Sequence, residues 1–293
     1  MRVLITGAGG FVGSHLVRAL AAAGDLEVIA VLRRPSAEQP RAHPRVSRVV
    51  TDLAKPHGLP QRIDAVVHAG ATLVGSTRAM LQDNAVATAG LADYACAAGA
   101  RRFVYLSSLS IYGDIDGTEV APETRIVDPG AYGLTKYLGE LALREVASSL
   151  PSLAIRLPGV LGRGSVRNWL STVAARVRRG EEVTIFNPAA PFNNAAHVDD
   201  ICRFAEALLR REWQGADAVT IGAAGMTTVR AAVATLIDAY GSPSTIAVGH
   251  ATKPAFTISS RKASELYGYA PMEIGAMLRH FAAETRQGAT PGA

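Results

Sequence analysis

The chain is poor in several residue types that would define other protein classes. Its only two cysteines, Cys96 and Cys202, lie too far apart to suggest a disulfide framework or a cysteine-based zinc site. Aromatic residues make up 6% of the chain, and the basic residues are scattered rather than interleaved with them. We therefore expect no nucleic-acid partner, although the net charge is +5. Apolar runs such as the one after Asp25 are broken by Glu27 and Arg33, well short of the roughly 20 residues that a membrane helix needs.

The rest of the composition is typical of a globular protein. Hydrophobic residues account for 48% of the chain and charged residues for 19%, so a sizeable core can form. The length of 293 residues, at roughly 150 residues per domain, predicts two folding units or one enlarged α/β unit. The opening segment MRVLITGAGG predicts a strand and a glycine turn rather than an apolar leader. Together with the few cysteines, this favours a cytoplasmic protein without a membrane partner.

Short β-branched runs alternate with helical patterns from Arg2 to Pro158. Strands are predicted at VLIT, EVIAVL, RVSRVV, DAVVHAG, RFVYLSS and LAIRLP. Helices are predicted through Leu16 and Leu20, from Leu81 to Ala97, and from Ala131 to Val146. Nearly continuous apolar strands, each followed by a helix, are typical of a parallel sheet covered on both faces. The predicted fold class is therefore α/β, with a doubly wound parallel (Rossmann) sheet that binds a dinucleotide over residues 1–158.

The pattern loosens after Pro158 into Gly- and Pro-rich loops mixed with helices and short strands. Helices are expected from Asp200 to Arg210 and around Ala231 and Met277, with strands at AVTIG and TIAVG. We expect residues 159–293 to form a smaller C-terminal α/β portion that binds the substrate, with some elements returning to the Rossmann sheet.

A glycine turn follows the first predicted strand. Gly7, Gly10 and Gly13 recur at intervals of three residues before the first helix. Gly7 permits the tight turn, Gly10 lets the backbone approach a pyrophosphate, and Gly13 lets helix and strand pack closely. The free N–H groups at the start of that helix would then face the phosphates.

The end of the second strand indicates which cofactor is used. An acidic residue there would hydrogen-bond the free 2′-hydroxyl of NAD, but Leu32 takes that place, and Arg33 and Arg34 follow it. Arginines can pair with a 2′-phosphate, so NADP(H) is the preferred cofactor and NAD(H) the other possibility. Asp52 and Leu53, at the end of the third strand, are expected to meet the adenine.

A tyrosine and a lysine four residues apart indicate the chemistry. Tyr132 and Lys136 share one face of a predicted helix, and an ammonium beside a phenol favours the phenolate. The strand RFVYLSS ends at Ser107 and Ser108, on the sheet edge where doubly wound folds bind ligands. A hydroxyl there could hold a carbonyl oxygen that Tyr132 protonates.

With these residues in view, the chain resembles an extended short-chain dehydrogenase/reductase, the group that includes NAD(P)-dependent nucleotide-sugar epimerases, dehydratases and reductases. The matching segments run in family order over nearly the whole chain: TGAGGFVG, TDL, VVHAGA, the Asn84 region, FVYLSSLSIYG, YGLTK, RLPGVLG and HVDD. These motifs are specific for the family and not for the substrate.

The resemblance implies a role for each matching residue. Tyr132 would be the general acid/base, and Lys136 would lower its pKa and hold the nicotinamide ribose. Ser108, rather than Ser107 or Ser110, would bind the reacting oxygen. Further cofactor contacts are implied for the backbone N–H groups of Phe11 and Val12, for Ala69, Gly70 and Ala71, for Asn84, and for Pro158 and Val160. Asn84 could equally be a buried structural amide.

Two positions depart from the pattern of family members that handle sugar nucleotides. Gly159 stands where an Asn commonly contacts the substrate, and Asn193 stands near the place of an Arg that grips the diphosphate. Asn193 can still hydrogen-bond a phosphate, and Asn168 is a second candidate for the substrate site.

No metal site is predicted from the sequence. His197, Asp199 and Asp200 form the one suggestive group, and adjacent Asp residues at a helix start more often cap the helix and complement its dipole.

These residues support one leading function and three alternatives. The leading one is an NADP(H)-dependent reductase of a keto group on a nucleotide-linked sugar. The alternatives are a nucleotide-sugar epimerase or dehydratase, a carbonyl reductase for a small non-nucleotide substrate, and a non-catalytic dinucleotide-binding protein. The resemblance also implies a homodimer through the helices around Cys96 and Leu141.

Overall fold

The computed structural model describes residues 1–35 and 43–286, and these divide into two compact units. The first unit comprises Met1–Asp114, Arg125–Arg156 and Cys202–Val219. The second comprises Ile115–Thr124, Leu157–Ile201 and the chain from Thr220. The change of unit at Leu157 lies close to the predicted boundary after Pro158. The sequence pattern did not predict that Ile115–Thr124 belongs to the second unit.

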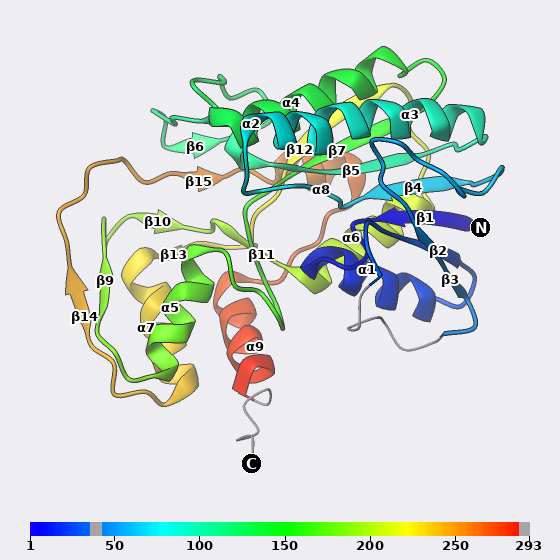
Figure 1. Cartoon of the computed structure of the whole chain (residues 1–293). Helices are drawn as coiled ribbons and strands as arrows, with labels where there is room; N and C mark the ends of the chain where they lie inside the picture. Colours follow the sequence, from blue (N-terminus) through cyan, green and yellow to red (C-terminus); the bar gives the residue numbers. More distant parts are fainter. Residues whose placement is uncertain (36–42, 287–293) are drawn as a thin grey trace. The chain divides into compact units, whose positions relative to one another are not determined.

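A seven-stranded parallel sheet forms the centre of the first unit and confirms the predicted fold class (Figure 1). Its order is β12-β7-β5-β4-β1-β2-β3. The strands are β1 (Arg2–Thr6), β2 (Glu27–Leu32), β3 (Val46–Val50), β4 (Ala65–His68), β5 (Phe103–Ser108), β7 (Ser152–Leu157) and β12 (Ala216–Thr220). β1 pairs with both β2 and β4, so the direction of winding reverses between β1 and β4. Doubly wound sheets bind ligands at this kind of switch point.

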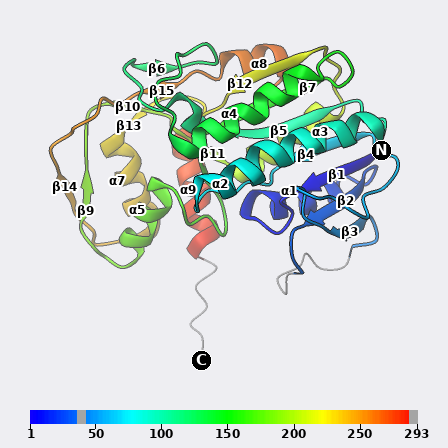
Figure 2. The same cartoon turned by 45° about the horizontal axis from the view of Figure 1, so that its top comes forward.

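Helices cover both faces of this sheet because its inner strands are apolar throughout. One face carries three consecutive helical elements: α2 (Thr77–Met80), the π-helical turn η1 (Leu81–Val86) and α3 (Ala87–Ala97). They lie beside α4 (Gly130–Glu145), as Figures 1 and 2 show. On the other, α1 (Phe11–Ala22) packs against β1 and β2. A 3-10 turn, η2 (Leu109–Tyr112), follows β5, and α6 (Val198–Leu209) begins in the second unit and ends in the first.

The second unit contains short paired strands and, among its described residues, four helices that lie wholly within it. The strands are β6 (Glu119–Val120), β8 (Gly159–Leu161), β9 (Val183–Ile185), β10 (Pro191–Phe192), β11 (Ala195–His197), β13 (Thr227–Thr228), β14 (Ile246–Val248) and β15 (Thr257–Ile258). They pair as β10 with β13, β11 with β8, β14 with β9, and β15 with β6. The helices are α5 (Trp169–Arg178), α7 (Val229–Tyr240), α8 (Arg261–Tyr267) and α9 (Ile274–Arg286).

Pairing between distant segments places two of these strands. The segment AVTIG contributes to β12 at the edge of the seven-stranded sheet, so it is one of the later elements that return to the Rossmann sheet. β6, which lies before the predicted boundary, pairs in parallel with β15 and so belongs to the second unit. Both placements depend on backbone pairing between segments distant in sequence, which local apolar patterns do not encode. Within the described ranges 1–35 and 43–286, no helix combines the length and apolarity that crossing a membrane requires.

Candidate active site

The glycine turn between β1 and α1 has the geometry of a phosphate cradle. Gly7 has a φ of 65°, a left-handed conformation that favours glycine, and its carbonyl accepts a hydrogen bond from the Gly10 N–H at 2.8 Å. A Cβ on Gly7 would lie 2.6 Å from the N atom of Gly70, and a Cβ on Gly13 would overlap the carbonyl of Gly7. Side chains are therefore excluded from the point where the first helix, the first strand and the turn after β4 meet.

The first N–H groups of α1 are left without partners inside the helix. Phe11, Val12 and Gly13 open this helix, and the first N–H groups of any α-helix have no intrahelical acceptor. No acidic side chain occupies its first turn. The dipole of the helix and these N–H groups together suit a bound phosphate, and the contact of Phe11 and Val12 with a pyrophosphate stays a prediction.

A pocket of about 790 Å³ opens beside this turn at the switch point of the sheet. Residues from the ends of β1, β2, β3 and β4 line it: Gly7, Gly9, Gly10, Val31, Leu32, Arg33, Arg34, Pro35, Thr51, Leu53, Ala69, Gly70, Ala71, Thr72 and Asp83. Asp52, predicted to meet the adenine, is not among them. Its carboxylate accepts a hydrogen bond from the Ala54 N–H at 3.0 Å, while its neighbours Thr51 and Leu53 face the pocket.

One wall of this pocket carries the two arginines singled out in the sequence. A guanidinium nitrogen of Arg33 lies 2.9 Å from a carboxylate oxygen of Asp83, which also accepts a hydrogen bond from the Thr72 hydroxyl at 2.5 Å. Arg34 lines the same pocket. The pairing of Arg33 with Asp83 was not predicted, because Asp83 follows β4 and is about fifty positions away in the chain. The negative charge of Asp83 therefore partly compensates the positive charge of Arg33, which would attract a 2′-phosphate.

The predicted catalytic tyrosine lies in the first unit near the end of β5. Tyr132 stands in the first turn of α4, and its phenol shares a hydrogen bond with the side chain of Ser108, the last residue of β5. Burial raises the pKa of the Tyr132 phenol, and the hydrogen bond with Ser108 acts in the opposite direction. Burial is the larger of these two effects, and the expected lowering of this pKa by Lys136 stays a prediction.

The three candidate serines have different surroundings. Ser108 accepts a hydrogen bond from the Ser110 N–H at 3.1 Å and also pairs with Tyr132. Ser107 is buried and donates its hydroxyl to a carboxylate oxygen of Glu140 at 2.6 Å. Ser110 is exposed. Ser108 is therefore the serine whose hydroxyl lies beside the predicted catalytic phenol.

Lys136 is fully buried one helical turn after Tyr132. Its ammonium nitrogen lies 4.0 Å from the centre of the Tyr105 ring, a cation–π contact on β5. Burial lowers the pKa of Lys136 to about 7, against an opposing effect of Glu140. A lysine in this position can gain or lose a proton near neutral pH.

A buried polar network behind Lys136 was missed by the sequence analysis. Glu140 and Arg156 form a bidentate ion pair, with N–O distances of 2.7 and 3.0 Å, and Arg156 also donates to the Tyr112 hydroxyl at 2.7 Å. Two signals could have revealed it. Glu140 continues the spacing of four residues from Tyr132 and Lys136, and Arg156 is the charged residue inside the apolar strand LAIRLP.

A buried histidine joins the strand ends of this unit. His68, at the end of β4, stacks on the Tyr105 ring at 5.4 Å between centroids and contacts the hydroxyls of Thr6 and Thr88. Burial and, to a smaller extent, Lys136 lower the pKa of His68 to about 3, so the ring is neutral at physiological pH. Its role in this structure is to hold neighbouring elements rather than to carry charge.

Asn84 forms a structural link rather than lining the pocket. Its buried side chain accepts from the Thr72 N–H at 2.7 Å and donates to the Thr72 carbonyl and the Thr135 hydroxyl. It thereby ties the loop after β4 to α4, the helix that carries Tyr132. It lies in a π-helical turn, a rare element that is frequent at functional sites.

The two predicted substrate residues of the second unit both hold backbone groups, and their contact with a substrate stays a prediction. The Asn168 side chain caps α5 by accepting from the Ser171 N–H, and it donates to the Val160 carbonyl. Buried Asn193 donates to the carbonyl and accepts from the N–H of Ile258, at 2.8 Å each. Both amides therefore use their donor and acceptor to hold the backbone.

Gly159 departs from the family pattern for a steric reason. A Cβ there would lie 3.1 Å from the Cβ of Asn168, so a larger residue would press on the cap of α5. Pro158 and Val160 also belong to the second unit, and their contact with the nicotinamide stays a prediction.

Comparison with known proteins agrees with this geometry. The sequence profile of the NAD dependent epimerase/dehydratase family matches residues 3–222. D-erythronate dehydrogenase of Cupriavidus necator is 29% identical over 259 residues, which cover 77% of this chain and 80% of that enzyme. UDP-glucose 4-epimerase of Erwinia amylovora is 30% identical over 234 residues, covering 68% and 69% of the two chains.

Solved structures show the same fold. MoeE5 in complex with UDP-glucuronic acid and NAD is 26% identical, with a TM-score of 0.81, and the match covers 98% of this chain and 100% of that one. UDP-glucuronic acid 4-epimerase from Bacillus cereus in complex with NAD superimposes with a TM-score of 0.84 at 21% identity, covering 98% and 99% of the two chains. With the family profile spanning the glycine turn, Ser108, Tyr132 and Lys136, this chain belongs to the NAD dependent epimerase/dehydratase family of enzymes.

Proposed function

We propose that the chain is an NADP(H)-dependent oxidoreductase that reduces a keto group on a nucleotide-linked sugar. The observation that carries this proposal is that Tyr132 at the start of α4, Ser108 at the end of β5 and the glycine-lined pocket lie in one unit, with Ser108 acting on the pKa of the Tyr132 phenol. A phenol and a neighbouring hydroxyl can both donate hydrogen bonds to the oxygen of a carbonyl group. The names of MoeE5 and the UDP-glucose 4-epimerase support a sugar nucleotide as the substrate class.

The chain's own residues would handle the proton of this reaction. The dinucleotide, when bound, supplies or accepts the hydride. Tyr132 donates its phenolic proton to the substrate oxygen, and Ser108 holds that oxygen by a hydrogen bond. Because its pKa is raised, Tyr132 keeps its proton at neutral pH, the form that a reduction requires. Lys136, with a pKa near 7, can return a proton towards the phenol.

The pocket wall supports NADP(H) over NAD(H). Leu32 stands where an acidic residue would bind a free ribose hydroxyl, and Arg33 and Arg34 line the same pocket. Both arginines can donate to a phosphate. The relatives solved with a dinucleotide hold NAD, so this preference is a proposal about this chain alone.

A second candidate function is oxidation or reduction of a small sugar acid. Two observations favour it. The amides of Asn168 and Asn193 each hold two backbone groups of the second unit, which leaves each amide fewer hydrogen-bonding sites for a nucleotide diphosphate. The D-erythronate dehydrogenase is also one of the relatives described above.

The experiment that tests these functions measures cofactor turnover with a panel of substrates. The purified chain is mixed with NADPH or NADH and keto sugar nucleotides, and with NADP⁺ or NAD⁺ and UDP-glucose, UDP-glucuronic acid or D-erythronate. Stoichiometric NADPH oxidation with a keto sugar nucleotide supports the leading proposal. Interconversion of epimers without net cofactor change would replace it with an epimerase, and turnover of D-erythronate alone would replace it with the second candidate.

The role of Tyr132 is tested by Tyr132→Phe, which removes only the hydroxyl. General acid catalysis contributes roughly 100- to 10,000-fold, so we expect kcat to fall by about that factor while the dinucleotide still binds. Tyr137→Phe, on the same helix, is the matched control and should keep wild-type kcat. Unchanged turnover by Tyr132→Phe would reject the mechanism.

We also propose that two copies associate through α3 and α4. These helices lie side by side on one face of the first unit and carry Cys96 and Leu141, both partly exposed in the single chain (Figures 1 and 2).

A further inference from the structure

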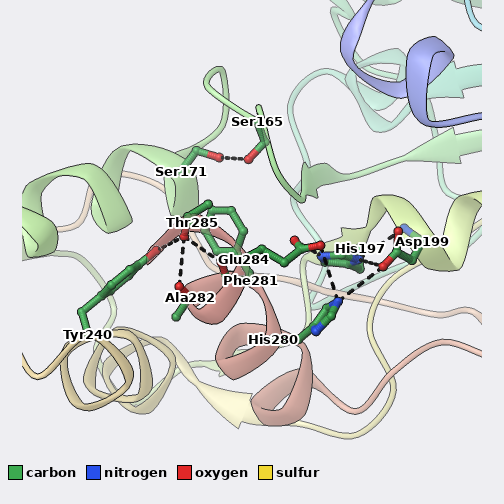
Figure 3. A network of polar contacts seen from close by, with 10 residues as sticks. All are labelled: Ser165, Ser171, His197, Asp199, Tyr240, His280, Phe281, Ala282, Glu284 and Thr285. Atoms are coloured by element: carbon green, nitrogen blue, oxygen red, sulfur yellow. Dashed lines mark hydrogen bonds and ion pairs between the residues drawn. The ribbon is translucent and has the colours of Figure 1, made fainter. Parts of the chain in front are cut away.

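The second unit contains a cluster of four polar side chains that the proposed reaction does not use. His197 ends β11, Asp199 lies in the first turn of α6, and His280 and Glu284 stand one turn apart on α9 (Figure 3). One ligand atom from each of the four lies within 4.8 Å of all the others. The last two residues lie some eighty positions after the first two, so only the fold brings them together.

We propose that these four side chains bind a divalent transition-metal ion, and that Zn²⁺ fits them best. Two imidazoles and two carboxylates are a ligand set that zinc accepts in tetrahedral geometry. Ligand bonds of about 2.0–2.2 Å place tetrahedral ligand atoms roughly 3.3–3.5 Å apart. Close approaches are 3.1 Å between His197 and one Glu284 oxygen, 3.6 Å between His280 and the other Glu284 oxygen, and 3.4 Å from an Asp199 oxygen to each of the two histidines.

Hydrogen bonds within this cluster are long, and they leave two carboxylates sharing few donors. Apart from the 3.1 Å contact, these approaches exceed the usual distance of an N–H···O bond. The His197 side chain is fully buried. Its Nε2 lies 3.1 Å from a Glu284 oxygen, and its Nδ1 lies 3.4 Å from an Asp199 carboxylate oxygen and accepts a hydrogen bond from the Asp199 N–H at 3.3 Å. A neutral imidazole has one N–H to donate, whereas two carboxylates offer several acceptor sites. A shared cation would compensate both carboxylates at once.

The cluster is open on one side. The side chains of Asp199 and His280 are 42% and 44% exposed, whereas that of Glu284 is 23% exposed. Solvent can therefore deliver the ion to one side and a chelator can remove it. Because the ligands come from β11, the start of α6 and α9, a bound ion would fasten the last helix to its neighbours within the second unit.

The test measures metal binding by the full chain, purified without a histidine tag and treated with a chelator. Equilibrium dialysis with Zn²⁺ should give one ion per chain, and Co²⁺ should give the strong visible absorption of a tetrahedral site. His280→Ala and Glu284→Gln should each lower the affinity tenfold or more. His43→Ala, which removes an exposed histidine of the first unit, is the matched control and should bind like the wild type.

Folding is checked separately, because a lost site and a lost fold must be told apart. The metal-free thermal transitions of the His280→Ala and Glu284→Gln proteins should match that of the wild type, since both residues lie partly in solvent. Zn²⁺ should raise the melting temperature of the wild type and of His43→Ala only. Binding below one ion per chain in the wild type, or equal affinity in all four proteins, would overturn the proposal. Neither readout depends on the reaction proposed above.

Discussion

At the scale of single residues, the choice of cofactor depends on two adjacent arginines at the end of β2. Charge-assisted hydrogen bonds contribute about 1.5–3 kcal/mol each, so Arg33→Ala or Arg34→Ala should weaken NADP binding by roughly 10- to 100-fold. Binding of NAD should change little, because NAD lacks the 2′-phosphate. Fluorescence titration with both dinucleotides measures this, with Arg18→Ala, an exposed arginine of α1, as the control for net charge.

The ion pair between Arg33 and Asp83 sharpens this prediction. Asp83→Asn removes a carboxylate 2.9 Å from the Arg33 guanidinium, so the variant should bind NADP at least as tightly as the wild type. Equal losses of NAD and NADP affinity in Arg33→Ala would reject the role in binding the 2′-phosphate.

At the scale of elements, the position of α4 against the end of β5 sets the catalytic geometry. Gly133 follows Tyr132, and a Cβ there would overlap the carbonyl of Ser110 in η2. Gly133→Ala must therefore push α4 away from η2 or strain both. We expect a loss of about 1–3 kcal/mol in the free energy of unfolding, with a fall in kcat as Tyr132 moves relative to Ser108. Urea unfolding and turnover assays measure the two effects.

Gly90 on α3 is the matched control for that substitution. A Cβ there meets no heavy atom within 4 Å, so Gly90→Ala should be neutral or stabilise the fold by up to about 1 kcal/mol through helix propensity. A Gly133→Ala protein as stable and as active as Gly90→Ala would show that the contact between α4 and η2 is not tight.

At the scale of the whole molecule, stability should depend on pH because Lys136 is buried. Its pKa is about 7 in the folded chain and near 10.5 in an unfolded one. Between these values the unfolded chain binds more protons, so the free energy of unfolding rises with pH, by at most about 1.4 kcal/mol per pH unit. Urea unfolding between about pH 7.5 and 9 should show this rise, and Lys136→Met should lose it. An unchanged slope in Lys136→Met would assign the effect to other groups.

The proposed dimer is also a property of the whole molecule. Sedimentation equilibrium should give the mass of two chains at micromolar concentration. Leu141→Glu places a charge on the partly exposed part of α4 and should shift the equilibrium to single chains without changing the circular dichroism spectrum. A single-chain mass for the wild type would contradict the proposal.

Local patterns were sufficient for the fold of the first unit. Continuous apolar strands such as β4 and β5 can only be buried on both faces, and the glycines of TGAGGFVG have few uses other than a tight turn against a helix. The α/β class, the strand positions and the family were therefore predictable, because each follows from burial or backbone conformation over a short segment.

Other features of this protein were decided only by the tertiary structure. The amides of Asn168 and Asn193 are polar groups whose backbone partners are set by the fold, and these partners could not be predicted from their sequence positions. Burial raises the pKa of Tyr132, an effect that neighbouring residue types do not reveal. His197 and His280 meet only because β11 and α9 pack together. Spacing along the chain determines which side chains share one face of a helix or strand. The burial of a side chain, its pKa and its hydrogen-bonding partners depend on segments that only folding brings together.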